Sequence, residues 1–520
     1  MKSKAAAEGP QKTGTEQSVQ RPWGLYATVA GSGAAVMAIE VLGTRLLGPV
    51  FGVGLFVWAA LLSVTLCSLA IGYYAGGAWA DRVPTPRPLG TVLLVAAVTL
   101  AVVVPLSRSI LSLALDLGHR LGPLVAGTAL FTLPLALLGA VGPMVIRITT
   151  RDVRLTGHSA GSVYAISTAG SLFGTLLVSF WAIPSFETTT IFVWTAGLLA
   201  LLGAFWLAGA ARGFALILAA SLPVTGSNHD DRLLPTHLEV VARVHSPYSL
   251  LEVIDDEKRQ VRFLRADHSI IGGMFKQDGD VIFNYLRVLN ATPSLRPTAN
   301  KALQIGMGTG ALAGLLHAQG VEVDIVEIDP GVVQLATDYF GFKASGQVVV
   351  EDARTFLSHA KPGYDIIIHD TFTGGATPAH LLSVEVVQQI KRLLRPDGLL
   401  ALSFVGFAEG DDVEIMNAVY STVRAVFPNT RLFRDSARAS AEPTLVNLLL
   451  FASTGEIDLT AASGMSELAR NLLGTGELTP TTKVPAITDA HNPLSQLQLP
   501  VAEAHFQAME KLLPRAVWLP

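Results

Sequence analysis

Long runs without charged side chains dominate the first 225 residues, whereas later apolar runs are short. The long runs occupy about 24–43, 53–79, 88–107, 121–146, 159–183 and 188–211. A helix needs about 20 apolar residues to cross a hydrocarbon core of roughly 30 Å. The pattern therefore predicts six membrane-crossing helices. A further apolar stretch at 213–224 is short for a span, and we interpret it as interfacial or as an extension of the sixth helix.

The hydrophobic pattern changes twice beyond the membrane runs. Short alternating runs such as HLEVVARV and QVRFLRAD predict a small β-rich module over 236–293. Over 294–520, strand-like runs such as KALQIG and YDIIIHD alternate with helical stretches. This alternation predicts an α/β doubly wound domain, Rossmann-like and of the class I methyltransferase type, with a C-terminal extension. The sequence predicts a disordered tail over residues 1–22. It predicts a multi-pass helical membrane domain over residues 23–225.

Charge is distributed unevenly along the chain. Up to residue 229 there are 13 Lys and Arg against 7 Asp and Glu, whereas the remainder is acidic. With the N-terminus inside, the inner segments hold ten basic residues: Lys2, Lys4, Lys12, Arg21, Arg82, Arg87, Arg147, Arg151, Arg154 and Arg212. The outer segments hold Arg45, Arg108 and Arg120.

Basic residues in short loops favour the cytoplasmic side of a membrane. The bias therefore predicts a multi-pass cell-membrane protein with a cytoplasmic N-terminus. Six crossings would return the chain to the cytoplasm after residue 212 and place the C-terminal half there. If 213–224 crossed as well, that half would lie outside.

Composition excludes several classes of partner. The lone cysteine, Cys67, falls within the second apolar run, so we expect neither a disulfide framework nor a thiol metal site. An acidic C-terminal half repels phosphate backbones, so we expect no nucleic acid. The expected partners are small molecules and the lipid bilayer, and the oligomeric state stays open.

Charges and glycines within the apolar runs have structural interpretations. Glu40 and Arg45 lie near the end of the first run, where charges can extend to the interface or pair with each other. Glycines four residues apart allow close helix packing. Two such pairs occur: Gly72 with Gly76, and Gly170 with Gly174.

A nucleoside site is predicted from a glycine turn and three acids. LQIGMGTGAL places Gly306, Gly308 and Gly310 between a strand and a helix, where the backbone can approach a ligand closely. Three acids follow successive predicted strands: Glu327, Asp352 and Asp370. Ligands of such sheets bind at the carboxyl ends of the strands. We therefore expect these groups to line one crevice.

The crevice favours a cationic nucleoside over a dinucleotide. A dinucleotide usually has Gly-x-Gly-x-x-Gly beneath its pyrophosphate. Here the spacing is Gly-x-Gly-x-Gly and the surroundings are acidic, which suits a sulfonium such as S-adenosylmethionine or a relative. Glu327 would accept both ribose hydroxyls. Asp352 would accept the adenine amino group, beside the backbone of Ala353.

The order of motifs over about 236–455 resembles the polyamine aminopropyltransferases, or spermidine synthases, in their membrane-fused bacterial form. The motifs are SPYSLLEV, RADHSII with Asp267, NYLRVLNATP with Tyr285 and Pro293, IGMGTG, VEID, EDAR and IIIHDTFTGGATPAHLL. The resemblance implies transfer of an aminopropyl group from decarboxylated S-adenosylmethionine to a diamine, usually putrescine, with release of methylthioadenosine. The donor is a co-substrate, and no prosthetic group is implied.

The resemblance also implies roles for individual residues. Asp370 would accept the proton of the attacking amine, and Tyr285 and Thr373 would contact that amine. The residues expected to bind the nucleoside co-substrate are Ser249, Asp267, Gly306, Gly308, Thr309, Gly310, Glu327, Asp352, Ala353 and Pro378. His369 is interpreted as a core residue, and His380 as a residue that caps or packs a helix.

The chain departs from the family at positions that bind the amine. Thr373 stands in place of a second aspartate, and Thr309 in place of an aspartate in the glycine turn. The other departures are Ser249, Ile271, Leu286 and Arg287. The resemblance therefore predicts nucleoside recognition but does not fix which amine is accepted.

Two alternatives remain open from the sequence. One is a membrane-anchored methyltransferase of the same fold that uses intact S-adenosylmethionine. The other is a small-cation transporter whose cytoplasmic domain senses a nucleoside without chemistry.

Overall fold

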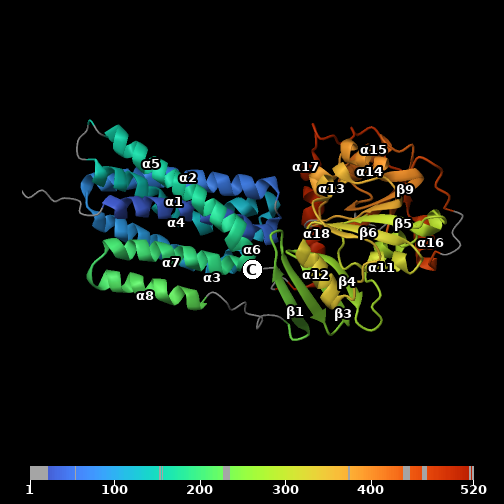
Figure 1. The fold of residues 1–520 in the computed structure, drawn as a ribbon, viewed down its shortest axis with the longest axis horizontal. Coiled ribbons are helices and arrows are strands. Elements are labelled where there is room, and N and C mark those ends of the chain that lie inside the picture. The colour runs from blue at the N-terminus through green and yellow to red at the C-terminus, as the bar shows by residue number, and fades with distance from the viewer. Residues whose placement is uncertain are drawn as a thin grey trace, which may run out of the picture.

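A computed structural model shows an N-terminal bundle of helices joined to a C-terminal α/β unit (Figure 1). The structure describes residues 22–517 except 53, 151–153, 155, 226–234, 373–374, 437–444, 460–464 and 515–516. The expected disordered tail, apart from residue 22, lies outside this range. We call residues 22–225 the membrane unit, because its long helices are compatible with crossing a membrane, and residues 235–517 the C-terminal unit.

The membrane unit contains six helices that are long and apolar enough to cross a membrane, within the part of the chain described. They are α1 (Pro22–Phe51), α2 (Leu55–Arg82), α3 (Pro86–Leu115), α4 (Gly118–Thr149), α5 (Thr156–Leu177) with its continuation through η2 (Val178–Ala182) and α6 (Ile183–Ser185), and α7 (Thr188–Trp206). The six apolar runs of the sequence thus correspond to the six helices.

The stretch after α7 does not extend that helix. It forms a separate helix, α8 (Gly209–Thr225), which folds back along α7 (Figure 1). Gly209 has a φ of +58°, a conformation that glycine adopts readily at a chain reversal. Gly197 of α7 faces the carbonyl oxygen of Ala219 in α8, so the two helices form an antiparallel pair.

The reversal changes where the C-terminal unit sits relative to the N-terminus. One end of the bundle holds the beginning of α1 beside the end of α7, where Trp23 packs against Phe205. The other end holds the end of α1 beside the beginning of α4, where Gly122 packs against Phe51. The C-terminal unit docks on this second end, whereas a six-span count predicts the first.

Glycines allow α2 and α4 to pack closely, as their spacing predicts. A Cβ atom at Gly76 would lie 2.5 Å from the Cα of Ala140, and one at Gly72 would strike the carbonyl oxygen of Ala136. Gly170 and Gly174 of α5 pack against α1 in the same way. Both pairs therefore have a packing role.

The C-terminal unit begins with an antiparallel four-stranded sheet in the order β1-β2-β3-β4. Its strands are β1 (Leu238–His245), β2 (Leu250–Asp256), β3 (Val261–Ala266) and β4 (Ser269–Phe275). Two short helices follow, α9 (Asn284–Leu289) and α10 (Thr292–Leu295). This part corresponds to the predicted β-rich module.

The second sheet is Rossmann-like and has the order β12-β10-β11-β9-β8-β5-β6-β7. The parallel strands are β5 (Lys301–Ile305), β6 (Glu322–Glu327), β7 (Val348–Val350), β8 (Tyr364–His369) and β9 (Leu394–Phe407). The strands β10 (Asn429–Arg434), β11 (Leu445–Ser453) and β12 (Glu477–Leu478) complete it in antiparallel pairings.

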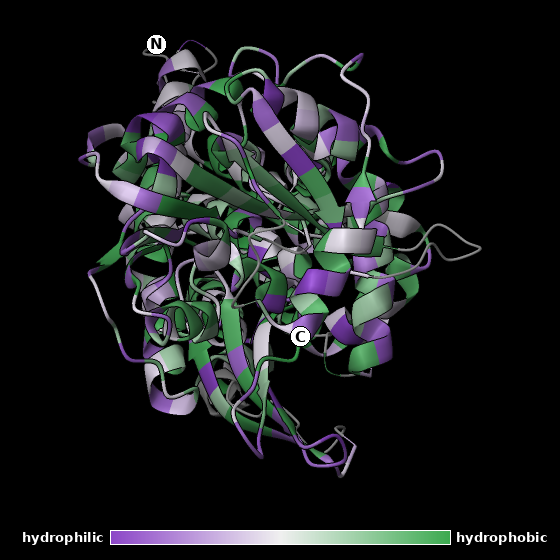
Figure 2. Cartoon of the chain, turned by 90° about the vertical axis from the view of Figure 1, so that its right-hand side faces the viewer, coloured by the Kyte–Doolittle hydropathy of each residue, from purple (hydrophilic) through white to green (hydrophobic). Residues whose placement is uncertain are grey.

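Helices cover both faces of this sheet (Figure 2). They are α11 (Ala311–His317), α12 (Pro330–Tyr339), α13 (Ala353–His359), η4 (Ala379–Leu381), α14 (Val384–Leu393), α15 (Glu414–Arg424) and α16 (Glu467–Thr475). Because both faces are buried, the centre of β8 holds three consecutive isoleucines rather than alternating apolar and polar residues. Ile366 and Ile368 enter one apolar core, and Ile367 enters the other.

The C-terminal unit packs firmly against the membrane unit. After α17 (Leu494–Leu497), helix α18 (Leu499–Leu512) places Phe506 and Met509 in the same apolar cluster as the membrane helices. Arg45 of α1 donates a hydrogen bond to the carbonyl oxygen of Pro247. His245 lies 3.6 Å from Glu187. The contact made by Arg45 was not predicted from the sequence.

We predict that Gly76→Ala destabilises the membrane unit by ~1–3 kcal/mol, because the added methyl group overpacks the contact with α4. Gly77→Ala is the matched control, since a Cβ atom there would meet only the Cβ of Pro143 at 3.9 Å. Thermal unfolding in detergent measures both variants. Equal melting temperatures for Gly76→Ala and Gly77→Ala would contradict this role of Gly76.

Candidate functional site

A cavity of about 560 Å³ lies at the carboxyl ends of the parallel strands. Its wall includes residues that follow β5, β6, β7 and β8, residues of the small sheet, and residues of the membrane unit. The strand-end groups predicted from the sequence therefore face one space. The position agrees with the general rule for ligands of wound sheets.

The glycine turn brings the backbone to the cavity wall. Gly306 has a φ of +84°, and a Cβ atom there would strike the carbonyl oxygen of Asp370. Gly308 has a φ of +53° and also lines the cavity. Thr309 packs against Gly272, whereas Gly310 packs against Phe342. Thr309 and Gly310, which the sequence predicted to bind the nucleoside, are therefore not part of the cavity wall.

Glu327 holds the glycine turn in place while facing the cavity. Its Oε2 accepts the backbone N–H of Met307 at 2.9 Å, and its Oε1 accepts that of Asp329 at 3.0 Å. Burial raises the pKa of Glu327, and the backbone hydrogen bonds oppose that rise. Each carboxylate oxygen can accept more than one hydrogen bond, so ribose hydroxyls can still be bound.

Asp352 begins helix α13 and pairs with a histidine. Its Oδ1 accepts the backbone N–H of Thr355 at 2.9 Å, and its Oδ2 lies 3.1 Å from Nε2 of His380. Burial acts to raise the pKa of Asp352, but the Thr355 and His380 contacts hold it below its ordinary value. Ala353 and Pro378 lie on the same part of the wall.

Asp370 lies on the cavity wall directly after β8. Burial raises its pKa to about 7, although the neighbouring hydroxyls of Ser403 and Tyr285 act in the opposite direction. The Tyr285 hydroxyl donates to Oδ2 of Asp370 at 3.4 Å. Burial, followed by the Asp370 charge, raises the pKa of Tyr285 well above 10, so this hydroxyl keeps its proton. Asp370 can therefore exchange a proton near neutral pH.

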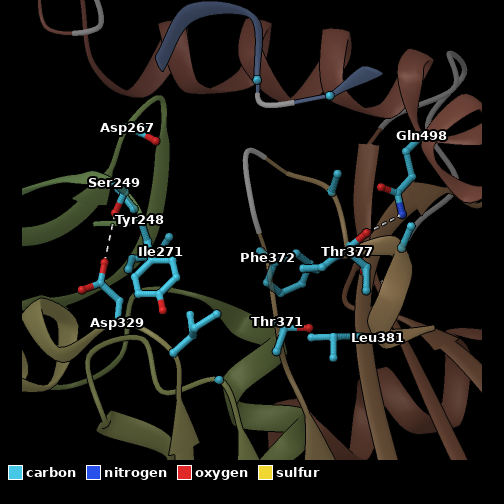
Figure 3. A pocket seen from close by; sticks show the side chains of 18 of the residues that line it. Tyr248, Ser249, Asp267, Ile271, Asp329, Thr371, Phe372, Thr377, Leu381 and Gln498 are labelled. Carbon is cyan, nitrogen blue, oxygen red and sulfur yellow. Dashed lines mark hydrogen bonds between the residues drawn. The ribbon is translucent and has the colours of Figure 1, made fainter. Parts of the chain in front are cut away.

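A further acid that was not predicted from the sequence, Asp329, follows β6 and contacts the β1–β2 connection of the small sheet (Figure 3). Asp329 caps helix α12, and its Oδ2 accepts hydrogen bonds from Ser246 at 2.6 Å and from Ser249 at 3.3 Å. Asp267 accepts the Leu250 backbone N–H at 2.9 Å. An acid before a proline at a strand end is a signal for such a cap, so Asp329 could have been found in VEIDP.

Two further segments complete the wall. Phe372 and Thr377 come from the chain after β8, and Gln498 donates to the carbonyl oxygen of Thr377 at 3.1 Å (Figure 3). The turn between α1 and α2 supplies Phe51 and Phe56. No sequence signal connected the membrane helices to this cavity, because the contact joins segments about 300 residues apart.

Several family positions for the amine have other roles here. Leu286 is buried in the apolar core, and Arg287 pairs with Asp280 at 2.7 Å. Thr373 lies outside the described residues. His369 is buried, with its Nε2 3.1 Å from the carbonyl oxygen of Leu381, and burial lowers its pKa to about 4. It is therefore a neutral core residue, as expected.

The cavity is acidic overall. Five carboxyl groups line it: Asp267, Glu327, Asp329, Asp352 and Asp370. Among the described residues that form its wall there is no lysine or arginine. Such a lining favours a cationic ligand and disfavours an anionic one.

Comparison with known proteins finds a family match within this unit. Residues 283–433 match the family described as the spermine/spermidine synthase domain. An N-terminal histidine N-methyltransferase of Emericella nidulans is 30% identical over 303 residues, which cover 51% of this chain and 53% of that protein. A polyamine aminopropyltransferase of Vibrio vulnificus is 34% identical over 167 residues, covering 31% of this chain and 55% of that protein.

The chain thus spans about half the length of these two curated relatives. Among solved structures, a probable spermidine synthase of Corynebacterium glutamicum is 19% identical with a TM-score of 0.40, covering 51% of this chain and 95% of that one. The family match covers β5, β6, β7 and β8, whose ends build the cavity. Within the C-terminal unit, residues 283–433 are thus similar to the spermine/spermidine synthase domain.

Proposed function

We propose that the chain is an aminopropyltransferase that binds decarboxylated S-adenosylmethionine in the main cavity and transfers its aminopropyl group to an amine. A diamine such as putrescine is the simplest acceptor. The observation that supports this most strongly is the acidic cavity without a lysine or arginine on its described wall. Decarboxylated S-adenosylmethionine is wholly cationic, whereas the intact molecule would bring its own carboxylate into this space.

The reaction needs a neutral amine and an aligned sulfonium. The amine nitrogen attacks the carbon next to sulfur, the carbon–sulfur bond breaks, and its electron pair remains on the sulfur of methylthioadenosine. The amine proton passes to the Asp370 carboxylate. Because burial raises the pKa of Asp370 to about 7, it is a stronger base than an ordinary carboxylate and is still largely ionised slightly above neutral pH.

Binding of a cation also offsets the free-energy cost of keeping the buried carboxyl groups ionised. Burial raises the pKa values of Glu327, Asp267 and Asp370, so ionising these carboxyl groups without a nearby cation is unfavourable. A sulfonium between them would stabilise their charged forms and lower those pKa values. In this arrangement Glu327 binds the ribose and Asp352 binds the adenine amino group.

A second cavity provides a site for the far end of a diamine. It has a volume of about 190 Å³ and shares Ile271, Tyr285 and Phe372 with the main cavity. Asp435 lines it and accepts a hydrogen bond from Nδ2 of Asn447 at 2.8 Å.

The charge of this second cavity suits an ammonium group. Burial raises the pKa of Asp435, and the contacts with Asn447 oppose that rise. His505 on the same wall has its pKa lowered to about 4 by burial, so it carries no competing positive charge at neutral pH. Asp435 can thus replace the second aspartate that the family has at the Thr373 position.

A methyltransferase is the second candidate. The relative from Emericella nidulans, named as an N-terminal histidine N-methyltransferase, aligns over 51% of this chain, a longer stretch than the aminopropyltransferase relative from Vibrio vulnificus. Thr309 and Thr373 also remove two acids that the aminopropyltransferase resemblance leads one to expect. In this alternative Asp370 would accept a proton from an amine that receives a methyl group from intact S-adenosylmethionine.

Product analysis separates the two candidates. The purified full chain is supplied with either form of the donor and a panel of amines, and the products are identified by mass spectrometry. We expect the acceptor to gain one aminopropyl unit from the decarboxylated donor. Methylated acceptor from the intact donor, without aminopropyl product, would overturn the proposal in favour of the second candidate.

We predict that Asp370→Asn lowers kcat by about 10²–10⁴-fold, because the amide cannot accept the amine proton. Binding of methylthioadenosine, measured by calorimetry, should change less than about threefold, since other residues bind the nucleoside.

For the unchanged protein, kcat/KM should fall about tenfold per pH unit below pH 7 as Asp370 becomes protonated.

Tyr285→Phe tests whether the protonation of Asp370 causes the fall of kcat/KM below pH 7. We call this fall the acid limb of the pH profile. The Tyr285 hydroxyl acts to lower the pKa of Asp370, so its removal should move the limb to higher pH. A limb that stays in place in Tyr285→Phe, or equal losses of turnover and nucleoside binding in Asp370→Asn, would refute this division of roles.

We predict that Asp435→Asn raises KM for a diamine about 10–150-fold, the effect of losing a charge-assisted hydrogen bond of ~1.5–3 kcal/mol. KM for a monoamine of similar length should stay unchanged, because it has no second ammonium group. Asp411→Asn, at an exposed turn, is the matched control. An equal rise for monoamine and diamine would show that Asp435 does not bind the distal group.

A further inference from the structure

The two ends of the membrane unit differ in charge, and the C-terminal unit docks on only one of them. Among the described residues, the first end carries five arginines: Arg82, Arg87, Arg147, Arg154 and Arg212. This is the end where α1 begins, and Arg147 of α4 pairs there with Asp81 of α2 at 3.3 Å. The sequence that precedes α1 also holds four basic residues: Lys2, Lys4, Lys12 and Arg21.

The second end is poorer in basic residues and contacts the C-terminal unit. Arg45, Arg108 and Arg120 lie nearer to this end than to the first. Arg45 donates to the carbonyl oxygen of Pro247, and Glu187 lies 3.6 Å from His245. A Cβ atom at Gly118 would lie 3.4 Å from Oε1 of Glu503 in α18. Contacts from the last turns of α1, the α6–α7 connection and the beginning of α4 thus fix which end carries the C-terminal unit.

Helix α8 lets the chain reach this second end. Helix α7 ends at the arginine-rich side, and α8 begins there with Arg212 in its first turn. Its 17 residues span about 25 Å at 1.5 Å per residue, close to the thickness of the hydrocarbon core. Because α8 runs antiparallel to α7, it delivers the chain to the opposite side (Figure 1).

The positive-inside rule then gives the orientation. We propose that α8 is a seventh crossing and that the C-terminal unit with its main cavity lies on the extracytoplasmic face, where it acts on an amine of that compartment. This reverses the cytoplasmic placement expected from six crossings. Only the nature of the substrates rests on the proposed function; the orientation rests on the fold and the charge distribution.

The main cavity also meets the membrane unit directly. Phe51 and Phe56, at the α1–α2 turn, form part of its wall together with strand-end acids such as Asp370 (Figure 3 shows the turn above the cavity). Val57, in the first turn of α2, lines it as well. The acceptor therefore reacts beside the outer surface of the bilayer. An amine that is exported, or presented on an exported molecule, meets this site without passing through the membrane unit.

Cysteine labelling tests the orientation without any assay of the reaction. Cys67, the one cysteine of the chain, is first removed by the substitution Cys67→Ala. Single cysteines are then introduced into this full-length variant. Lys361→Cys reports on the C-terminal unit, because Lys361 is exposed in the α13–β8 connection. Thr85→Cys reports on the exposed α2–α3 turn at the arginine-rich end. Both sites lie outside the proposed catalytic machinery.

Spheroplasts expressing each variant are treated with a membrane-impermeant maleimide, and total reactivity is measured after detergent. We expect Lys361→Cys to label fully before detergent and Thr85→Cys to label only after it. The reverse pattern would overturn the proposal and restore a cytoplasmic C-terminal unit. If the reaction proposed above proved wrong while Lys361→Cys still labelled from outside, the orientation would stand.

Discussion

The cost of burying carboxyl groups is the constraint on which the site depends. Glu327 and Asp370 face one cavity, and burial raises the pKa of each. Such groups either take up protons or gain a cationic partner, because an isolated charge is unstable away from water. The described wall offers no lysine or arginine to serve as that partner. The cationic ligand that we propose would complete the site electrostatically, and the wound sheet holds the acids at one edge.

The membrane unit is part of this site rather than a remote anchor. The α1–α2 turn lines the cavity, and α18 shares an apolar cluster with the membrane helices. Arg45 ties α1 to the turn before Tyr248 and Ser249, which also line the cavity. Movement of the helical bundle would consequently alter the shape of the main cavity. The helical bundle and the proposed reaction site are thus joined through direct contacts.

Much of the fold and part of the site could be predicted from local sequence patterns. Six apolar runs predicted six helices, and the strand ends located Glu327 and Asp370, because the carboxyl ends of parallel strands meet at one edge. The roles of these residues in binding and catalysis remain predictions. Asp435 and the α1–α2 turn were missed because their positions depend on long-range packing, which leaves no periodic signal.

The path of the chain after α7 could not be predicted in full, for a local reason. Residues 213–224 do not extend the sixth helix but form a separate one, and the reversal before it depends on the positive φ of Gly209. Thr309 and Gly310 were expected at the ligand because they belong to the glycine motif. The turn of the backbone instead directs them into the packing against Gly272 and Phe342. A motif fixes the path of the chain more reliably than the direction of each side chain.

The most direct test of the central claim is a structure of the full chain in a lipid nanodisc with methylthioadenosine bound. The account predicts that the ribose lies against Glu327, the adenine beside Asp352 and the sulfur next to Asp370, beneath the α1–α2 turn. Density for the nucleoside elsewhere in the molecule, or a ribose far from Glu327, would contradict it.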